Sequence, residues 1–432
     1  MLISFSVANF RSFKEKQTID LRVIKKFHST KNFANNYFDS KLKNTGELLK
    51  SSAIYGANAS GKSNLIKAVY AFNSVALNLD NDMNQRTRNQ PIKPYDPFAF
   101  DDDFKKKPTE FEIDFIAEKT RYRFSFGYDN KKIHYEKLEF LKENSASDNF
   151  KLIYYWQFDK NDQLKTDFSN EFQGNKDRSL EILKNTQNNL FLFLNVNEDG
   201  NKFLNPIYDW IANKLNIVFD HDNFGVASKW IIKDPKNKKL TIDLIKKFDL
   251  GIKDFKFEEI DIPKKFFEDP KVPEEIKEKF RNEKITNFSF ITKTDHKLRE
   301  SQISLGTKAI FSMASQIFPV LIDGGVLFFD ELDSSLHPDI LLEVIKMFHN
   351  PKINIGNGQI IFTIHNDILL DKEYKIFRRD QVWFASKDQQ THDSFLYSLA
   401  EFTSEKITSK SNIVNLYRDN CFGARPLIRN QK

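Results

Sequence analysis

The sequence predicts an α/β protein built on one parallel sheet whose strands come from two distant parts of the chain. A short apolar strand, "SSAIY" (51–55), runs into the glycine loop "GANASGKS" (56–63) and then into a segment with helical apolar spacing. A second apolar strand, "VLFFDE" (326–331), ends in two carboxylates, and a third, "GQIIFTIH" (358–365), ends in a histidine. Residues that follow parallel strands meet at one edge of the sheet, where α/β proteins bind ligands.

The remaining segments are assigned by their periodicity. "LISFSVA" (2–8) alternates apolar and polar residues, as a half-buried strand does. Residues 80–108 are polar and rich in proline, which indicates a surface excursion. Residues 110–158 carry runs with a period of two and predict an antiparallel meander. Residues 176–282 are mostly helical in pattern, and further helices are expected at 304–322 and 337–349.

This order predicts three segments. Residues 1–158 hold the glycine loop and the meander, residues 159–283 form a mainly helical insertion, and residues 284–432 hold the acidic strand and the histidine. The two halves of the parallel sheet are therefore interrupted by an insertion.

The composition points to a cytoplasmic protein. Hydrophobic residues make up 40% of 432 residues, which is enough for a sizeable core, and 43 are phenylalanine. The net charge of +6 is a small excess that neither requires nor excludes a nucleic-acid partner. One cysteine, Cys421, excludes an internal disulfide and a cysteine metal cluster. The N-terminus does not resemble a secretion signal, and no apolar run has the length of a membrane helix.

The glycine loop has the pattern G-x-x-x-x-G-K-[ST] between a strand and a helix. Its backbone N–H groups suit phosphate oxygens, Lys62 suits the β- and γ-phosphates, and the Ser63 hydroxyl suits Mg²⁺. The pattern therefore predicts a nucleoside triphosphate site. The expected contacts are Gly56, Asn58, Ala59, Ser60, Gly61, Lys62, Ser63 and Asn64.

Three polar residues at the ends of the later strands complete a hydrolytic site. Asp330 is expected to hold Mg²⁺ with Ser63, and Glu331 is expected to polarise an attacking water. His365, 34 residues after Glu331, is expected to contact the γ-phosphate. The predicted catalytic residues are thus Lys62, Glu331 and His365.

"SQISLGTKAIF" (301–311) places a Ser–x–Gly turn before a predicted helix. Ser304, Gly306 and Thr307 offer a hydroxyl and free N–H groups to an anion. An ordinary helix N-cap explains the same residues equally well.

The order of these elements resembles ABC-type ATPases of the recombination and chromosome-maintenance branch. The resemblance extends along most of the chain to family fifteen of the AAA-type ATPases, through "LISFSVANFRSF", "DLGIKDFKFEE", "VLFFDELDSSLHP" and "LYRDNCFGARP", and is weak over 140–235. It implies an ABC-type ATPase head with ATP and Mg²⁺. Members of the family include the ATPases of two-component phage-defence systems: the abortive-infection AbiL pair, the restriction-linked RloA with RloB, and the PARIS ATPase. The related OLD nucleases carry a fused TOPRIM domain.

The resemblance also implies how copies of the chain pair. Ser304 of one copy would cap the γ-phosphate bound by another, which makes a head-to-tail homodimer or a higher homo-oligomer. Asp333 and His337 would line that interface, and Asn9 and Arg11 would lie near the phosphates.

Some family features are missing or displaced. The signature "SLGTK" lacks the glycine pair of transporters. Residues 62–304 carry no long heptad run and no C-x-x-C, so long coiled-coil arms and a zinc hook are not expected. Gln90 is a weak candidate for the Mg²⁺-sensing glutamine, and the role of Gly423, Ala424, Arg425 and Pro426 has no physical account beyond a turn.

Two functions follow as hypotheses. In the first, the chain is the ATP-hydrolysing sensor and scaffold of an anti-phage defence system. It restrains or activates a separate effector, a nuclease such as a TOPRIM protein, in response to a phage protein. In the second, the chain is a DNA-repair clamp or loader similar to RecF. The lysine-rich stretch 228–247 would then follow DNA phosphates, although a solvated loop and helix face is the simpler explanation of that stretch.

Overall fold

The computed structural model describes most of the 432 residues and divides them into two compact units. The larger unit comprises Met1–Phe219, Pro319–Asp333 and His337–Lys432, and the smaller one comprises Asp220–Phe318 and Ser334–Leu336. Residues 159–219 therefore belong to the larger unit and residues 220–283 to the smaller. Residues outside the description are 28–32, 82–85, 88, 144, 146–148, 197–202, 220–222, 249–250, 282–283, 372, 404–406, 408–410 and 426–432.

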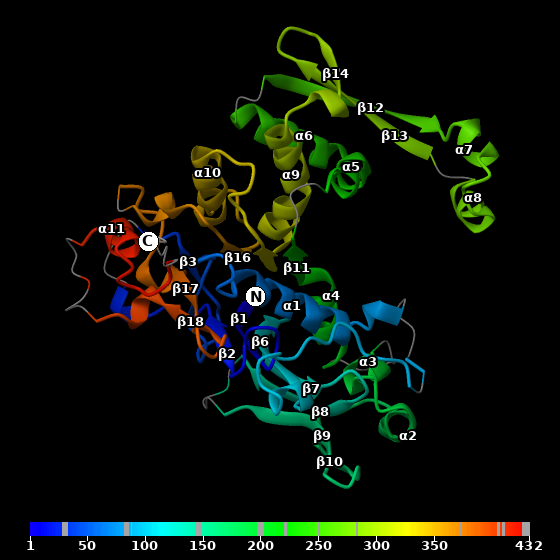
Figure 1. Cartoon of the computed structure of the whole chain (residues 1–432), viewed down its shortest axis with the longest axis vertical. Coiled ribbons are helices and arrows are strands. Elements are labelled where there is room, and N and C mark those ends of the chain that lie inside the picture. The colour runs from blue at the N-terminus through cyan, green and yellow to red at the C-terminus, as the bar shows by residue number, and fades with distance from the viewer. Residues whose placement is uncertain are drawn as a thin grey trace, which may run out of the picture. The chain divides into compact units, whose positions relative to one another are not determined.

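A mainly parallel sheet carries the predicted site (Figure 1). Its strand order is β11-β15-β16-β5-β17-β18, and only β18 runs antiparallel to its neighbour. Strands distant in sequence are thus neighbours, which confirms the prediction of an interrupted parallel sheet. The strands are β5 (Ser51–Gly56), β11 (Leu215–Val218), β15 (Val326–Phe329), β16 (Gln359–Thr363), β17 (Val382–Lys387) and β18 (Ser394–Ser398).

A seven-stranded antiparallel sheet forms the second layer of the larger unit. Its order is β10-β9-β8-β7-β6-β1-β2, so the meander extends the strand at the N-terminus. The strands are β1 (Leu2–Ala8), β2 (Gln17–Asp20), β6 (Thr109–Ala117), β7 (Thr120–Tyr128), β8 (Ile133–Lys142), β9 (Lys151–Phe158) and β10 (Leu164–Phe168).

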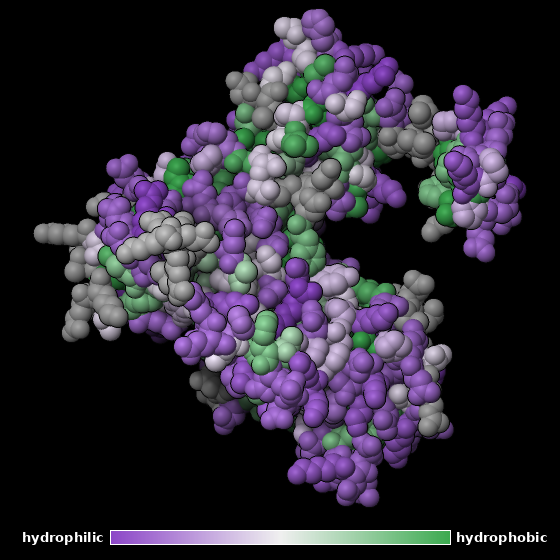
Figure 2. Space-filling view, in the orientation of Figure 1, coloured by the Kyte–Doolittle hydropathy of each residue, from purple (hydrophilic) through white to green (hydrophobic). Residues whose placement is uncertain are grey.

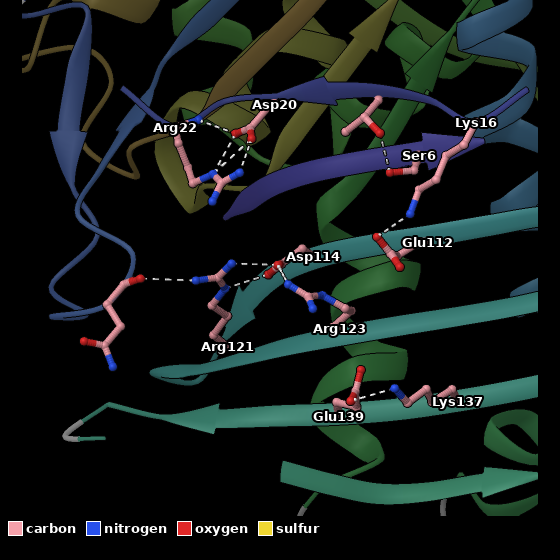
Figure 3. Close-up of polar contacts among 12 residues, drawn as sticks. Ser6, Lys16, Asp20, Arg22, Glu112, Asp114, Arg121, Arg123, Lys137 and Glu139 are labelled. Carbon is pink, nitrogen blue, oxygen red and sulfur yellow. Dashed lines mark hydrogen bonds and ion pairs between the residues drawn. The ribbon is translucent and has the colours of Figure 1, made fainter. Parts of the chain in front are cut away.

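One face of this sheet carries a buried ion pair (Figure 3). The Arg121 guanidinium donates two hydrogen bonds to the Asp114 carboxylate, at 2.8 and 2.7 Å, and Arg123 donates a third at 3.1 Å. The side chains of Asp114 and Arg121 are only 4% and 8% exposed. Because the fork of a guanidinium matches a carboxylate, the pair fixes β6 against β7.

Helix α1 (Lys62–Ala76) packs between the two sheets. The ring of Phe72 meets Phe5 and Phe111 edge to face, with centroids 5.9 and 6.0 Å apart, and stacks on Phe126 at 5.6 Å. Each fully buried phenylalanine contributes about 2 kcal/mol of hydrophobic free energy. The abundant phenylalanines therefore build the core that anchors the helix following the glycine loop.

Shorter elements complete the larger unit. Strands β3 and β4 form a two-stranded ribbon. In Figure 2, hydrophilic residues cover most of the face that is shown, and hydrophobic residues form small patches on it. The remaining elements are β3 (Tyr37–Asp39), β4 (Glu47–Leu49), α2 (Lys176–Thr186), α3 (Phe191–Asn195), α4 (Asn205–Lys214), α10 (Pro338–His349) and α11 (Ile413–Arg418).

The smaller unit combines helices with a long hairpin. Strands β12 and β13 pair antiparallel along nearly their whole length, and α7 and α8 lie at the tip of this hairpin (Figure 1). Phe311 of α9 stacks on Phe224 at 4.6 Å and meets Phe255 at 5.4 Å, which gives the unit its own core. Its elements are α5 (Phe224–Lys233), α6 (Pro235–Lys247), β12 (Ile252–Asp261), α7 (Lys264–Glu268), α8 (Glu274–Phe280), β13 (Lys284–Thr292), β14 (Lys297–Arg299) and α9 (Leu305–Asp323), which continues past Phe318.

The longest helix among the described residues is α9, with 19 residues, so the described chain has no long coiled coil. By length and composition alone α9 could cross a membrane, but 61% of its most apolar window is buried inside the structure. Such burial is typical of a core helix. The segment expected to be mainly helical also contains β10, β11 and β12, so the helical interpretation missed these strands.

Candidate phosphate-binding site

The predicted phosphate loop lines one side of a cavity of about 760 Å³ in the larger unit. It lies at the carboxyl end of β5, between β16 and β17. Glu331 and His365, which follow β15 and β16, line the same cavity. Residues 57–64, Lys67, Glu331, His365 and Lys387 make up its lining. Side chains from distant parts of the sequence thus meet because their strands are parallel neighbours.

The two glycines of the loop are required by close packing. A Cβ atom on Gly56 would lie 2.4 Å from the carbonyl oxygen of Ala385, and one on Gly61 would lie 2.7 Å from Ser394 Oγ. Gly61 also has a φ of +108°, which side chains disfavour. These positions let the loop fold tightly over the sheet edge and turn its backbone toward the cavity.

Lys62, the first residue of α1, is 5% exposed and folds back over the loop. Its ammonium donates to the carbonyl oxygens of Gly56 at 2.6 Å and Ala57 at 3.0 Å. Burial lowers the pKa of Lys62, while the carboxylates of Asp330, Glu331 and Asp333 act in the opposite direction. A cation held in this position favours a polyanion in the cavity.

Ser63 and Asp330 meet directly, as the sequence predicts. Ser63 Oγ donates to Asp330 Oδ1 at 3.0 Å, and Asp330 is 8% exposed. The same carboxylate oxygen accepts a hydrogen bond from Thr363 Oγ1 at 2.6 Å. Thr363 is the last residue of β16, so its hydroxyl ties the ends of β15 and β16 together.

Glu331 and His365 face each other across the cavity edge. Glu331 Oε1 and His365 Nε2 lie 3.4 Å apart, and both side chains are about half exposed. Glu331 has a φ of 51°, a strained conformation for a residue with a side chain. Its backbone N–H donates to Thr363 Oγ1 at 2.7 Å, which holds the strained turn.

Asp333 fixes the backbone that carries the histidine. Asp333 Oδ2 accepts hydrogen bonds from the N–H groups of His365 at 3.0 Å and Asn366 at 2.8 Å. His337 instead caps α10, where its Nδ1 accepts from the Asp339 N–H at 3.3 Å. The dimer-interface role expected for both residues stays a prediction.

The donor set fits a nucleoside triphosphate with Mg²⁺. The buried Ser60 hydroxyl has no hydrogen-bond partner among the described residues. Among those same residues, no group of three His, Cys, Asp or Glu side chains could hold a metal ion. The hydroxyl of Ser63 and the carboxylate of Asp330 are hard oxygen ligands of the kind that Mg²⁺ takes together with substrate phosphates.

Three residues expected near the nucleotide are not among those that line the cavity. Asn9, expected near the phosphates, is 3% exposed and donates to the carbonyl oxygens of Phe104 and Lys107, so it anchors that segment instead. Arg11 forms an ion pair with Asp96 at 2.9 Å and does not line the cavity. Gln90 accepts a hydrogen bond from the Thr87 N–H and does not line the cavity either.

The Ser–x–Gly turn belongs to the smaller unit. Ser304 Oγ accepts a hydrogen bond from the Thr307 N–H at 3.1 Å and lies 2.8 Å from Thr307 Oγ1, so it caps α9. Gly306 has room for a Cβ at van der Waals distance, 3.4 Å from the Ser335 oxygen. The N-cap alternative therefore describes Ser304 within one chain, and a contact with a nucleotide stays a prediction.

Sequence reasoning missed three residues of the site: Lys67, Thr363 and Lys387. Lys67 lies one turn after the glycine loop, so helical spacing could have found it. Thr363, a hydroxyl residue two positions before the predicted histidine, was a readable signal at a strand end. Lys387 ends β17, which pairs with β5 in the register Ala385 to Gly56, and only this pairing brings it to the loop.

Comparison with solved structures finds SMC head domains. The SMC head domain from Thermotoga maritima has a TM-score of 0.39 and 15% identity, over 92% of this chain and 98% of that chain. An SMC head bound to the C-terminal winged-helix domain of ScpA has a TM-score of 0.41 and 15% identity, over 94% and 99%. No curated protein sequence matches the chain.

A family model matches residues 51–371, about three quarters of the chain. The matched region begins at β5 and includes the glycine loop, the acidic pair and His365. This protein therefore belongs to the family described as "AAA domain, putative AbiEii toxin, Type IV TA system", and its domain is an AAA-type ATPase domain.

Proposed function

We propose that this chain binds and hydrolyses ATP as the sensor and scaffold subunit of an anti-phage defence system. The observation that carries the ATPase part is the convergence of Lys62, Ser63, Glu331 and His365 on one cavity, with Asp330 hydrogen-bonded to Ser63. The family description, which names a toxin and a type IV TA system, supports the defence part. The resemblance to the ATPases of two-component defence systems supports it too.

Each side chain has a role in this proposal. Lys62 leaves the loop carbonyls for the β- and γ-phosphates, Glu331 orients and polarises the attacking water, and His365 contacts the γ-phosphate. Ser63 and Asp330 would hold Mg²⁺, which neutralises charge on the phosphates. Pairing of two copies, head to tail around ATP, would bring Ser304 to the partner's site and couple hydrolysis to a separate nuclease effector.

The test uses Glu331→Gln, which should bind ATP and hydrolyse it slowly because the amide cannot polarise water as the carboxylate does. The variant is expressed with its neighbouring genes and purified with Mg-ATP, and its partners and mass are identified. A neighbour-encoded protein on a dimer or larger assembly is the expected result. Glu118→Gln, which changes an exposed carboxylate in the β6–β7 turn, is the matched control and should hydrolyse ATP normally.

Two outcomes contradict the proposal. Unchanged ATP hydrolysis in Glu331→Gln would show that Glu331 takes no part in the hydrolysis reaction. Full phage protection by the Lys62→Ala variant, in cells that carry the neighbouring genes, would show that defence does not require ATP binding.

A second function, a DNA-repair clamp or loader, is favoured by one observation in the smaller unit. Lys238, Lys239, Lys246 and Lys253 line a groove of about 590 Å³ between α6 and the start of β12. Two of them are paired, Lys238 with Asp254 at 3.5 Å and Lys253 with Asp295 at 2.6 Å, which weakens the groove as a polyanion site. A Glu331→Gln dimer that carries only DNA, released as salt rises, would favour this function over defence.

A further inference from the structure

Two aromatic rings lie exposed beside the phosphate cavity. The side chain of Phe100 is 58% exposed, and its ring centroid lies 4.4 Å from that of His392, with a 35° tilt between the rings. His392 is also exposed. A lone exposed phenylalanine needs no explanation, but two rings stacked on each other leave an outer aromatic face open to solvent.

Lys387 connects these rings with the cavity. Its side chain lines the phosphate cavity, and its ammonium lies 5.3 Å from the centroid of the Phe100 ring. Lys387 ends β17, whose pairing places Ala385 opposite Gly56 of the loop. The rings therefore lie one side chain away from the phosphate loop, beside β17 and away from Glu331.

The loop between β1 and β2 holds the segments that carry both rings. Arg11 donates its N–H to the carbonyl oxygen of Asp96 at 2.7 Å and pairs with the Asp96 carboxylate, while the Lys14 ammonium pairs with Asp101 at 2.8 Å. The Lys14 N–H donates to Asp393 Oδ1 at 3.0 Å. These bonds fix the residues on both sides of Phe100 and the residue after His392.

The same loop is fastened to the first turn of α1. The carbonyl oxygen of Ser12 accepts from the Ser394 N–H at 2.7 Å, and Ser12 Oγ accepts from Asn64 Nδ2 at 2.7 Å. Asn64 directly follows the glycine loop and lines the cavity. The ring pair is thus held at a fixed distance from the phosphate-binding backbone rather than on an independent surface loop.

We propose that Phe100 and His392 form the platform on which the purine base of the bound nucleoside triphosphate stacks. The phosphates of such a ligand lie against the glycine loop, so its base extends away from the loop. Bases stack on aromatic side chains through their π-faces, so the base adds a further layer to this stacked pair, and the two fused rings of a purine offer the larger π-face. Lys387 lies between the base and the phosphates. This inference rests on the proposed function, since it assumes that the cavity takes a nucleotide.

The test compares a ligand with a base and a ligand without one. Binding of ATP and of inorganic tripolyphosphate, each with Mg²⁺, is measured by calorimetry on the full chain and on Phe100→Ala. We expect the Kd for ATP to rise about tenfold or more and the Kd for tripolyphosphate to stay unchanged. Phe100→Trp should retain ATP affinity, and its indole fluorescence should be quenched by ATP but not by tripolyphosphate.

A matched control removes a similarly exposed ring elsewhere. Phe280, 36% exposed, lies in α8 of the smaller unit, and Phe280→Ala should leave both affinities unchanged. Equal ATP affinity in Phe100→Ala and the unchanged protein would overturn the platform while leaving the proposed function intact. An equal loss of ATP and tripolyphosphate binding in Phe100→Ala would also overturn it, because the damage would then lie in the phosphate site. Failure of the unchanged protein to bind either ligand would overturn both proposals.

Discussion

At the scale of single residues, the Thr363 hydroxyl holds both members of the acidic pair, Asp330 and Glu331, in position. Its hydroxyl donates to Asp330 Oδ1 and accepts from the Glu331 N–H, at 2.6 and 2.7 Å. One hydroxyl therefore orients the predicted metal ligand and stabilises the positive φ of the predicted catalytic residue. Thr363 is fully buried, so bulk water does not compete for these bonds.

Replacing Thr363 with valine should lower ATP hydrolysis with little change in the fold. Valine has nearly the same shape but leaves Asp330 and the Glu331 N–H without this partner, and loss of such supporting bonds costs about 10- to 100-fold in activity. The kcat and KM for ATP are measured alongside the thermal unfolding midpoint. Thr363→Ser keeps the hydroxyl and should retain most of the activity. An unchanged kcat in Thr363→Val would show that the hydroxyl does not position the carboxylates.

At the scale of elements, the C-terminal segment 412–425 packs against the site from the β17 side. Tyr417 of α11 is 6% exposed, and its ring meets Tyr55, the residue before Gly56, at 5.8 Å. Phe422 stacks on Phe384 of β17 at 4.9 Å. These contacts give a physical account of the motif "CFGARP", of which Pro426 lies outside the described residues: its phenylalanine supports the strands beneath the phosphate loop.

The same segment holds the turn that follows His365. The Arg418 guanidinium donates two hydrogen bonds to the Asp367 carboxylate, at 2.8 and 2.9 Å. Asp367 opens η6 (Asp367–Leu370), two residues after the histidine. The ion pair thus connects α11 to the backbone that positions His365.

Arg418→Ala should lower the kcat for ATP without weakening ATP binding. Loss of the ion pair frees the turn after His365 but leaves the phosphate loop unchanged, and we expect about a fivefold effect for a partly exposed bidentate pair. The kcat and the Kd for ATP are measured separately. The exchanged pair Arg418→Asp with Asp367→Arg should recover part of the lost kcat. A change in Kd alone would place the effect at the phosphate loop instead.

At the scale of the whole molecule, the predicted site residues belong to two compact units. Lys62 and Glu331 lie in the larger unit and Ser304 in the smaller. In the proposed head-to-tail pair, each complete site takes its phosphate loop from one copy and its Ser304 from the other. Activity would then belong to the pair rather than to the single chain.

Mixing two inactive variants tests this arrangement. Lys62→Ala removes the phosphate contact, and Ser304→Arg blocks the contact from the other copy, so each variant alone should lose most ATP hydrolysis. An equal mixture should recover about a quarter of the original activity, because half of the randomly formed pairs carry one intact site out of two. Hydrolysis rates at equal total protein are compared. No recovery from variants that fold and associate normally would mean that Ser304 acts within its own chain or not at all.

Sequence reasoning predicted those parts of the fold whose signals are local. The glycine loop, the apolar strands that end in Asp330 and Glu331 or lead to His365, and the meander were all readable, because strand period and loop chemistry are written in neighbouring residues. The hairpin of β12 and β13 and the edge strand β11 were missed. Their stability comes from pairing with strands distant in sequence, and short strands among helical segments carry a weak pattern.

The sequence by itself determined that a phosphate loop, a hydroxyl and two carboxylates are present, since each belongs to a short motif with its own chemistry. Only the tertiary structure decided which side chains surround them. Parallel pairing beside β5 brought Lys387 to the cavity, and the amide of Asn9 donates instead to the carbonyl oxygens of Phe104 and Lys107. Such choices depend on hydrogen bonds between residues about 100 or more positions apart, which no local pattern encodes.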